Sequence, residues 1–518
     1  MDDMETLTGR TAERNYAASN VTRLLCAGTY LDDGYRRAVI RELLIERYRN
    51  IAPSYGYDVV PVLGHALAAH RLRLLQSVTT IAAFLLFGLL WITGALGAEI
   101  TLPLFLWTAW AATYLLRIVT LETLMHRLKS GNSGNGFDGS YPHTDRLSTE
   151  RIDDLTEQQD TDRGVIFYGG FTPFVGAGFE EDAWARAELL VEAPPNPFDE
   201  DDPEDGDDDA AAEAAKKGLI PFTVREITEF VARRLEEDLR DHAEPLDRIE
   251  NLVVERRKFK KAISRTAAGK LDPSLDASLI HWEESYDAAR EFLCVRIGSW
   301  EQELVTSMFV GFDIKGNNLH IEFHPYVLPP ISQNFHLVDS LPDHFTPGLM
   351  FKVSFHALLA LPGEILTSLL HPLANRLPNA SMVDEKLDKK LAKGHRKIGA
   401  GSGGSLGLAR YTNLTLDRGA LHSVRELATP NRLHHFFQKS DLTKYTQVVQ
   451  RSLMQNIGVF LKDHNVDLSD HRATQANILQ HNYGDVNNYG PGNVNSSQGN
   501  RSKQTITDQS SDPAREEK

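Results

Sequence analysis

The stretch "LQSVTTIAAFLLFGLLWITGALG" (residues 75–97) is followed two residues later by "ITLPLFLWTAWAATYLLRI" (residues 100–118). A helix needs about 20 apolar residues to cross the hydrocarbon core of a bilayer, and both stretches approach that length with little charge. In lipid, a helix satisfies all of its backbone hydrogen bonds within one segment. The sequence therefore predicts a two-span transmembrane helical hairpin within residues 71–129.

The charges around the hairpin predict its orientation. Arg71 and Arg73 precede the first apolar stretch, and Arg117, Arg127 and Lys129 close the second. The connection between the stretches carries no Lys or Arg. Because cytoplasmic flanks are enriched in Lys and Arg, both ends of the hairpin, and hence both termini of the chain, are expected in the cytoplasm.

The residues inside the apolar stretches favour an anchor over a pore. The middle of each stretch lacks Asp, Glu, Lys and His, the residue types that usually mark an ion path. Threonines can pack neighbouring helices together, and this role is predicted for Thr79, Thr80, Thr108 and Thr113. Aromatic residues seat helices near the membrane surface, and the second stretch offers Trp107, Trp110 and Tyr114. The alternative is a buried helical hairpin in a soluble protein.

Composition excludes some classes of function. The 518 residues carry a net charge of -16, from 71 acidic and 55 basic side chains, whereas a nucleic-acid binder needs a concentrated basic face. The hydrophobic content of 42% can supply cores for two to four domains. Cys26 and Cys294 are the only cysteines, so a disulfide framework or a cysteine zinc cluster is not expected. The polar N-terminus is not typical of a secretory signal.

We expect an α+β protein in which a cytoplasmic mixed α/antiparallel-β module is tethered by the two-span hairpin. The predicted segments are N-terminal cytoplasmic helices (1–70), the transmembrane hairpin (71–129), a flexible linker (130–163), a strand-loop-strand unit (164–195), an acidic disordered linker (196–217), an α+β cytoplasmic domain (218–380), a basic and Gly/Ser-rich linker (381–410), a C-terminal helical segment (411–474) and a disordered tail (475–518).

The glycine-rich stretch "YGGFTPFVGAGF" (residues 168–179) joins two predicted strands, "RGVIFYGG" and "AWARAELLVE". A phosphate-binding loop instead leads from a strand into a helix whose N-terminus faces the anion. No Gly-Lys-Ser/Thr follows Gly170 or Gly176. A structural turn is therefore expected, with ligand binding as the alternative. Similarly, Gly399, Gly401 and Gly404 follow a basic run (386–397) instead of a strand, which favours a flexible linker. That run is either a solvated surface or a contact for anionic lipid.

Three strands are expected within residues 291–328, the last two joined by a tight turn at residues 315–317. His320, Glu322 and His324 occupy alternate positions of the third strand and therefore project from one face. Imidazole and carboxylate groups can bind zinc, so these three residues form the candidate metal site. The alternative is an ordinary solvent-facing stripe on a half-buried sheet.

Further helices are predicted by apolar spacing. They include two short helices before the hairpin with a break at residues 32–34, a capped amphipathic helix from about residue 221, and a helix at about 442–462. Residues 350–373 are also mainly apolar, but Lys352, His356, Pro362 and Glu364 interrupt them. This pattern favours a helix lying on the bilayer or buried in the domain over a third span.

Three short motifs carry a family resemblance: "PSYG" (53–56), "YGGFTPFVGAG" (168–178) and "LPP" (328–330). With them, most of the chain outside the acidic linker and the tail resembles uncharacterised predicted membrane proteins of actinomycete bacteria. The resemblance implies a protein of the bacterial inner membrane. It implies no particular chemistry.

The leading functional hypothesis is a non-enzymatic, membrane-anchored cytoplasmic scaffold or sensor that binds a protein partner or forms a homo-oligomer. One alternative is an effector whose hairpins assemble and permeabilise the membrane. Another is a metal-dependent enzyme that uses the face formed by His320, Glu322 and His324. No cofactor-binding motif is identified, and the expected partners are the lipid bilayer and protein, not nucleic acid.

Overall fold

The computed structural model describes residues 16–46, 49–130, 137–144, 146–159, 165–194, 219–245, 247–267, 270–271, 288–374, 415–430 and 433–476. The acidic run (199–209), the basic run (386–397), the glycine pattern (399–404) and the tail from residue 477 lie outside these ranges. By its internal contacts the chain divides into two units, Met1–Leu468 and Ser469–Lys518. Residues 469–476 of the second unit are helical.

The N-terminal part of the first unit contains the two predicted short helices, α1 (Asn20–Leu31) and α2 (Asp33–Ile40). A 3-10 turn (Tyr16–Ala18) precedes them and a π-helical turn (Arg41–Ile45) follows. Asp32 ends α1 and caps α2, because its side chain accepts hydrogen bonds from the backbone N–H groups of Gly34 and Tyr35. The predicted break at residues 32–34 is thus confirmed.

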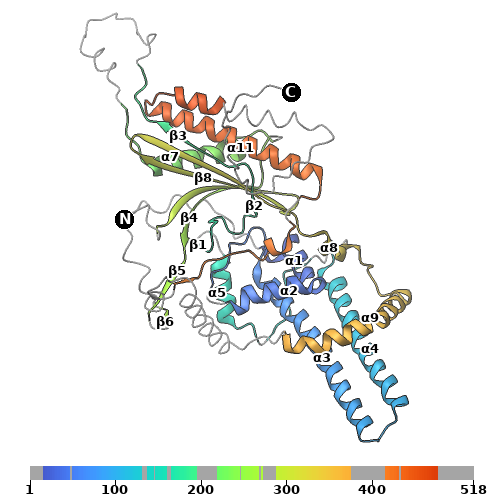
Figure 1. Cartoon of the computed structure of the whole chain (residues 1–518). Coiled ribbons are helices and arrows are strands. Elements are labelled where there is room, and N and C mark those ends of the chain that lie inside the picture. Colours follow the sequence, from blue (N-terminus) through green and yellow to red (C-terminus); the bar gives the residue numbers. More distant parts are fainter. Residues whose placement is uncertain are drawn as a thin grey trace, which may run out of the picture. The chain divides into compact units, whose positions relative to one another are not determined.

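The predicted hairpin is formed by α3 (Val59–Ile92) and α4 (Ala98–Thr123), which pack against each other (Figure 1). The side chain of Asp58 caps α3 by accepting from the backbone N–H of Val60. The first turns of α3 are buried in the helical core, and the same helix runs on without a break into the apolar stretch. A π-helical turn (Leu124–Leu128) follows α4.

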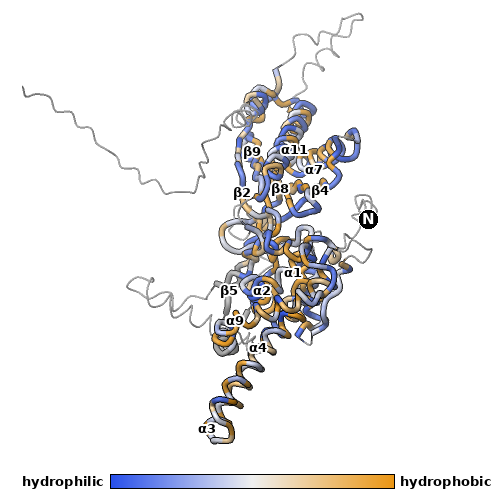
Figure 2. The backbone as a smooth tube through the Cα atoms, turned by 90° about the vertical axis from the view of Figure 1, so that its right-hand side faces the viewer, coloured by the Kyte–Doolittle hydropathy of each residue, from blue (hydrophilic) through white to orange (hydrophobic). Residues whose placement is uncertain are grey.

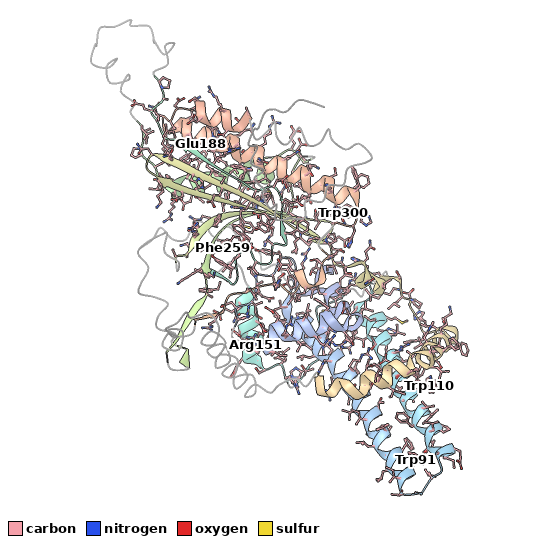
Figure 3. The ribbon with its side chains drawn as sticks, in the orientation of Figure 1. Trp91, Trp110, Arg151, Glu188, Phe259 and Trp300 are labelled. Carbon is pink, nitrogen blue, oxygen red and sulfur yellow. The ribbon has the colours of Figure 1, made fainter. Side chains whose placement is uncertain are left out.

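The interval 130–163, expected to be a linker, contains a helix that the sequence analysis missed, α5 (Thr149–Gln159). Leu147 and Leu155 are buried in the core formed by α1, α2 and the start of α3. Arg151 is also buried, and its guanidinium donates to the carbonyl of Leu43 with Nη2 at 2.7 Å (Figure 3). Residues 137–159 are therefore part of the helical core wherever the structure describes them.

Seven strands form one curled mixed sheet, shaped as a half-barrel (Figure 1). They are β1 (Val165–Tyr168), β2 (Phe179–Glu180), β3 (Trp184–Leu189), β4 (Leu252–Lys261), β7 (Arg290–Ser299), β8 (Leu304–Lys315) and β9 (Asn318–Leu328). The order is β1-β4-β7-β8-β9-β2, and β3 also pairs with β9. Only the β1–β4 pair of this sheet is parallel. The predicted strand-loop-strand unit (164–195) and the predicted domain 218–380 therefore share this sheet.

Strand β8 is buried on both faces along most of its length. The amphipathic helix α7 (Val224–Glu236), extended by a π-helical turn (Glu237–Asp241), packs with α11 (Phe436–Asp463) and contacts the sheet. Phe222 and Phe230 contact Phe460 of α11, with ring centroids 5.0 and 5.3 Å apart. Thr223 and Glu226 form the capping box that begins α7.

The remaining elements connect the sheet to the helices. A small sheet contains β5 (Ile263–Ala267), β6 (Lys270–Leu271) and β10 (Thr415–Asp417). After β9 come α8 (Gln333–His336), a 3-10 turn (Leu337–Ser340) and the long helix α9 (Pro347–Ala374). Within the predicted helical segment 411–474, residues 415–430 contain β10 and a short 3-10 turn (Glu426–Ala428), and α11 begins at Phe436, earlier than expected.

Candidate functional site

The hairpin is coloured mainly as hydrophobic along its backbone (Figure 2), and many of its large apolar side chains are exposed. The exposed ones are Leu75, Val78, Phe84, Leu85, Leu86, Leu89, Trp91 and Ile92 on α3, and Ile100, Leu102, Leu104, Leu106, Trp107, Leu115 and Val119 on α4. Soluble monomers rarely expose a contiguous apolar surface of this extent. The surface of the hairpin therefore indicates contact with lipid.

Three of the described helices are long and apolar enough to cross a membrane, by length and composition. They are Val59–Ile92, Ala98–Leu128 and Pro347–Ser368. The first two include the spans predicted from the sequence. The third belongs to α9, so α9 joins the hairpin as a candidate membrane element.

Small side chains of α3 and α4 are buried where these helices pack against each other and against α9. They are Ser77, Thr80, Ala83, Thr101, Ala109 and Thr113. Small residues let two helices approach closely within a membrane. Thr80 and Thr113 are buried, as the predicted packing role requires, whereas Thr79 is exposed and Thr108 is half-buried. The hydroxyls of all four donate to carbonyls of their own helices.

Charged side chains from three helices meet at the base of the hairpin, and we call Arg73, Gln76, Arg117 and Glu364 the basal cluster. Oε2 of Glu364, on α9, accepts from Nη1 of Arg73 at 2.9 Å. The other oxygen of Glu364 lies 3.8 Å from Nη2 of Arg117 on α4. One carboxylate of α9 thus pairs with the cation at the base of each hairpin helix.

Gln76 completes the basal cluster because its buried amide contacts all three helices. Its Nε2 lies 3.2 Å from the hydroxyl of Thr113 on α4 and 3.4 Å from Oε2 of Glu364. Its Oε1 accepts from Arg73 at 3.0 Å. A cavity of about 520 Å³ adjoins the cluster, lined by Asp33 of α2 and by residues 359, 360, 362–364, 367 and 368 of α9, among others.

The role of Gln76 and the contact between Glu364 and the hairpin were not predicted from the sequence. In each case the sequence contains a feature that predicts a contact with another helix. Gln76 is the single amide in the first apolar stretch, and Glu364 is the single acid within residues 350–373. A polar residue in a membrane segment usually faces a protein partner, so both positions predict contact with another helix.

The glycine-rich loop is occupied by a side chain of the protein itself. The backbone N–H groups of Gly176 and Gly178 each donate to Oε1 of Glu426 at 3.0 Å. Ser423 N–H donates to Oε2 at 2.7 Å. Burial raises the pKa of Glu426, and these hydrogen bonds oppose that rise. The backbone donors that would have to bind a phosphate therefore hold a carboxylate.

The same loop inserts Phe174 into an aromatic cluster on the sheet. Phe174 stacks on Phe309 with ring centroids 4.1 Å apart, and it also contacts Phe259, Phe292 and Tyr326. Figure 3 shows the position of Phe259 on the sheet. The expected structural role of the loop is thus supported by its packing.

The three motifs of the family resemblance meet where the helical core joins the sheet. Tyr55 of "PSYG" is buried in a cluster with Val305 and Leu328, which begins "LPP". In the glycine-rich loop, a Cβ at Gly176 would lie 3.1 Å from the carbonyl oxygen of Pro53. The motifs therefore hold the two parts of the fold together.

Buried arginines complete this junction. Nη1 of Arg425 donates to the carbonyl of Tyr55 at 2.7 Å, and Nη2 donates to the carbonyl of Glu303 at 2.6 Å. Arg257 donates to the hydroxyl of Tyr55 at 3.1 Å and forms an ion pair with Glu255. Burial lowers the pKa of Arg425 to about 10, whereas it raises the pKa of Tyr55 to about 12.

The residues of the predicted metal site lie on one face of β9, as expected, opposite the buried Leu319, Ile321 and Phe323. Nε2 of His320 lies 3.2 Å from Glu322, and Nδ1 of His324 lies 2.9 Å from Glu180 on β2.

The interaction between Glu322 and Nε2 of His324, which lies 3.7 Å away, raises the pKa of His324 and lowers that of Glu322. In the described part of the chain, no three His, Cys, Asp or Glu side chains converge as metal ligands. The metal hypothesis stays a prediction.

Strands β3, β4, β7, β8 and β9 of the large sheet, together with α7, α9 and α11, fall within one family match, whereas β1 and β2 precede it. The chain belongs to the AbeC-like domain family, whose profile matches residues 183–496. The hairpin α3–α4 lies outside the matched region, whereas α9 lies within it. No curated protein and no solved structure is detectably similar to the chain.

Proposed function

We propose that the protein is a membrane-anchored cytoplasmic scaffold or sensor. In this proposal α3 and α4 span the bacterial inner membrane, as in the actinomycete proteins that the sequence resembles, and the half-barrel with its helices binds a protein partner or a second copy of the chain. The observation that carries the proposal is the apolar surface of the hairpin, which has cations at one end and a connection without Lys or Arg at the other.

Several features support an anchor over a channel. The buried contacts between α3 and α4 beyond Gln76 are made by small and hydroxyl side chains, and the ionisable residues of the hairpin are grouped near its base, apart from Glu99 at the connection. The AbeC-like region supplies a broad, folded surface on the cytoplasmic side, which suits binding better than conduction.

The topology is tested with single cysteines in oriented vesicles. Ala95→Cys lies in the connection between the helices, and Glu122→Cys lies near the opposite end of α4; both positions are exposed. Both native cysteines are buried, so they do not react with an impermeant maleimide. We expect Ala95→Cys to react only in right-side-out vesicles and Glu122→Cys only in inside-out vesicles. The reverse pattern would overturn the proposed orientation. Release of the protein from the vesicles by alkaline carbonate would overturn the proposal that the hairpin spans the membrane.

The scaffold role is tested by crosslinking the full-length protein in its host membrane, followed by purification in mild detergent and quantitative mass spectrometry. We expect either a second protein in stoichiometric amount or crosslinks between copies of the chain. A monomer without partners would contradict the proposal. Loss of membrane potential on expression, absent in a matched variant lacking residues 71–129, would favour the permeabilising effector instead.

A further inference from the structure

Helix α9 has three different sides. The side toward the hairpin carries Ala357, Leu361 and Ser368, which are all buried, together with Glu364 of the basal cluster. At about 3.6 residues per turn, these positions lie along one stripe. Trp110 on α4 makes a second contact with α9, nearer the start of α9, because its Nε1 donates to the carbonyl of Ser354 at 3.2 Å (Figure 3).

The second side of α9 is apolar and exposed. It carries Phe351, Phe355, Leu358, Leu359 and Leu366, each at least half exposed. Their spacing of four, seven, eight and fifteen residues from Phe351 follows the helical repeat. This side continues the apolar surface of the hairpin, with which α9 is in contact. The partner that fits it is therefore the hydrocarbon that surrounds the hairpin.

The third side of α9 is polar and exposed. Lys352 and His356 lie one turn apart, and Thr367 follows on the same side. If α9 crossed the bilayer, this lysine and histidine would face lipid, at a cost that makes such placements rare. A helix with one apolar and one basic side instead suits the plane of the membrane interface.

The orientation of α9 and its position along the hairpin agree with a helix in the plane of the membrane interface. Figures 1 and 2 show α9 crossing the hairpin near its base instead of running beside it. From Arg73 to Ile92, α3 rises roughly 29 Å at about 1.5 Å per residue, close to the ~30 Å of a hydrocarbon core. The basal cluster, which holds α9, thus lies at the level where the hydrocarbon ends.

We propose that α9 is an in-plane helix of the cytoplasmic membrane interface. Phe351, Phe355 and Leu358 enter the acyl chains, while Lys352 and His356 face the headgroups and water. The basal cluster sets the position of the helix along the hairpin. This inference rests on the proposed function, because it requires that α3 and α4 cross the bilayer with the basal cluster on the cytoplasmic side.

The test measures the depth of fluorescent labels in the full-length protein, reconstituted in vesicles of phosphatidylcholine and phosphatidylglycerol. A maleimide dye is attached to single cysteines at exposed positions. Phe351→Cys and Leu366→Cys report the apolar side of α9, and His356→Cys reports the polar side. Leu86→Cys, on the surface of α3, is the control for the hairpin. Quenching is compared between lipids brominated near the headgroup, lipids brominated deep in the chain, and aqueous iodide.

We expect the labels at Phe351 and Leu366 to be quenched best by the shallow lipid and to lie within about 5 Å of each other in depth. The label at His356 should respond to iodide. A spanning α9 would separate the depths at Phe351 and Leu366 by up to roughly 22 Å, since fifteen residues rise about 1.5 Å each. Either that separation or iodide quenching of both labels would overturn the inference.

The control at Leu86 separates failure of this inference from failure of the proposed function. Quenching of Leu86→Cys by the deep lipid shows that the hairpin is inserted. If Leu86→Cys is quenched deeply while the labels on α9 respond only to iodide, the anchor stands and the in-plane helix does not. If Leu86→Cys itself responds only to iodide, the membrane anchor fails, and the in-plane assignment of α9 falls with it.

Discussion

Two phenylalanines of the glycine-rich loop are predicted to differ sharply in their effect on stability. Phe174 is 4% exposed and contacts five aromatic rings of the sheet, whereas Phe171, three residues earlier, is 98% exposed. Replacing a buried phenylalanine by alanine costs about 3–5 kcal/mol. We expect Phe174→Ala to lower the free energy of unfolding by about 4 kcal/mol and Phe171→Ala to change it by less than about 0.5 kcal/mol.

The assay is urea unfolding of the full-length protein in detergent micelles, with the folded fraction read by pulse proteolysis. At a slope of about 3 kcal/mol per molar urea, Phe174→Ala should lower the midpoint by a little more than 1 M. Phe174→Leu keeps much of the buried volume and should lie between Phe174→Ala and the wild type. Equal midpoints for Phe171→Ala and Phe174→Ala would refute the reasoning that Phe174 anchors the loop.

Two further predictions use the same assay. Glu426→Ala should cost about 3 kcal/mol, because three backbone N–H groups lose their acceptor at about 1 kcal/mol each, while Glu426→Gln, which keeps one acceptor oxygen, should cost clearly less; equal losses would contradict this. The hydrogen bond that Nε2 of His336 donates to Glu303 raises the pKa of His336, so the folded state binds the proton more tightly. This stabilisation is present below about pH 6.5 and is lost as pH rises through the raised value. His336→Gln should therefore lower the free energy of unfolding by about 1 kcal/mol or less at pH 6 and should leave it unchanged at pH 9. An equal decrease at both pH values would contradict this prediction.

Local periodicity predicted much of the fold. The apolar stretches of the hairpin, the alternation along β9 and the capping box of α7 each identify an element from its own residues. Helix α5 was missed because Ile152 and Leu155 are its only aliphatic side chains. Its stability depends on burying Leu155 against helices far away in sequence, which its own composition does not reveal.

The occupant of the glycine-rich loop could not be predicted, because Glu426 lies about 250 residues from the backbone groups that it binds. The spacing of Ser423 and Glu426, S-x-x-E, is a capping-box pattern, and the two residues do exchange hydrogen bonds. That pattern predicts a local turn at most. The contact with Gly176 and Gly178 exists only once the sheet brings both loops together.

The interpretation of the apolar helix α9 depends on its contact with the hairpin. On sequence alone, residues 350–373 combine many apolar side chains with scattered charges, which suits an interfacial helix, a buried helix or a poor span. The contact with the hairpin places Glu364 on the side of α9 that faces α3 and α4. The remaining exposed residues then divide into an apolar side and a polar side. The acid that most disfavours membrane insertion is thus the residue that pairs α9 with the hairpin.

The basal cluster also joins the AbeC-like region to a hairpin outside it. Glu364 belongs to the matched region, and Arg73 and Arg117 do not. These side chains are about one-third exposed or less, so solvent screens their interaction less than it would at an open surface. Moving α9 away from the hairpin would separate Glu364 from both Arg73 and Arg117, although Arg73 would keep its contacts with Asp33 and Gln76. A shift of the half-barrel that is transmitted through α9 must therefore either break this cluster or carry the hairpin with it.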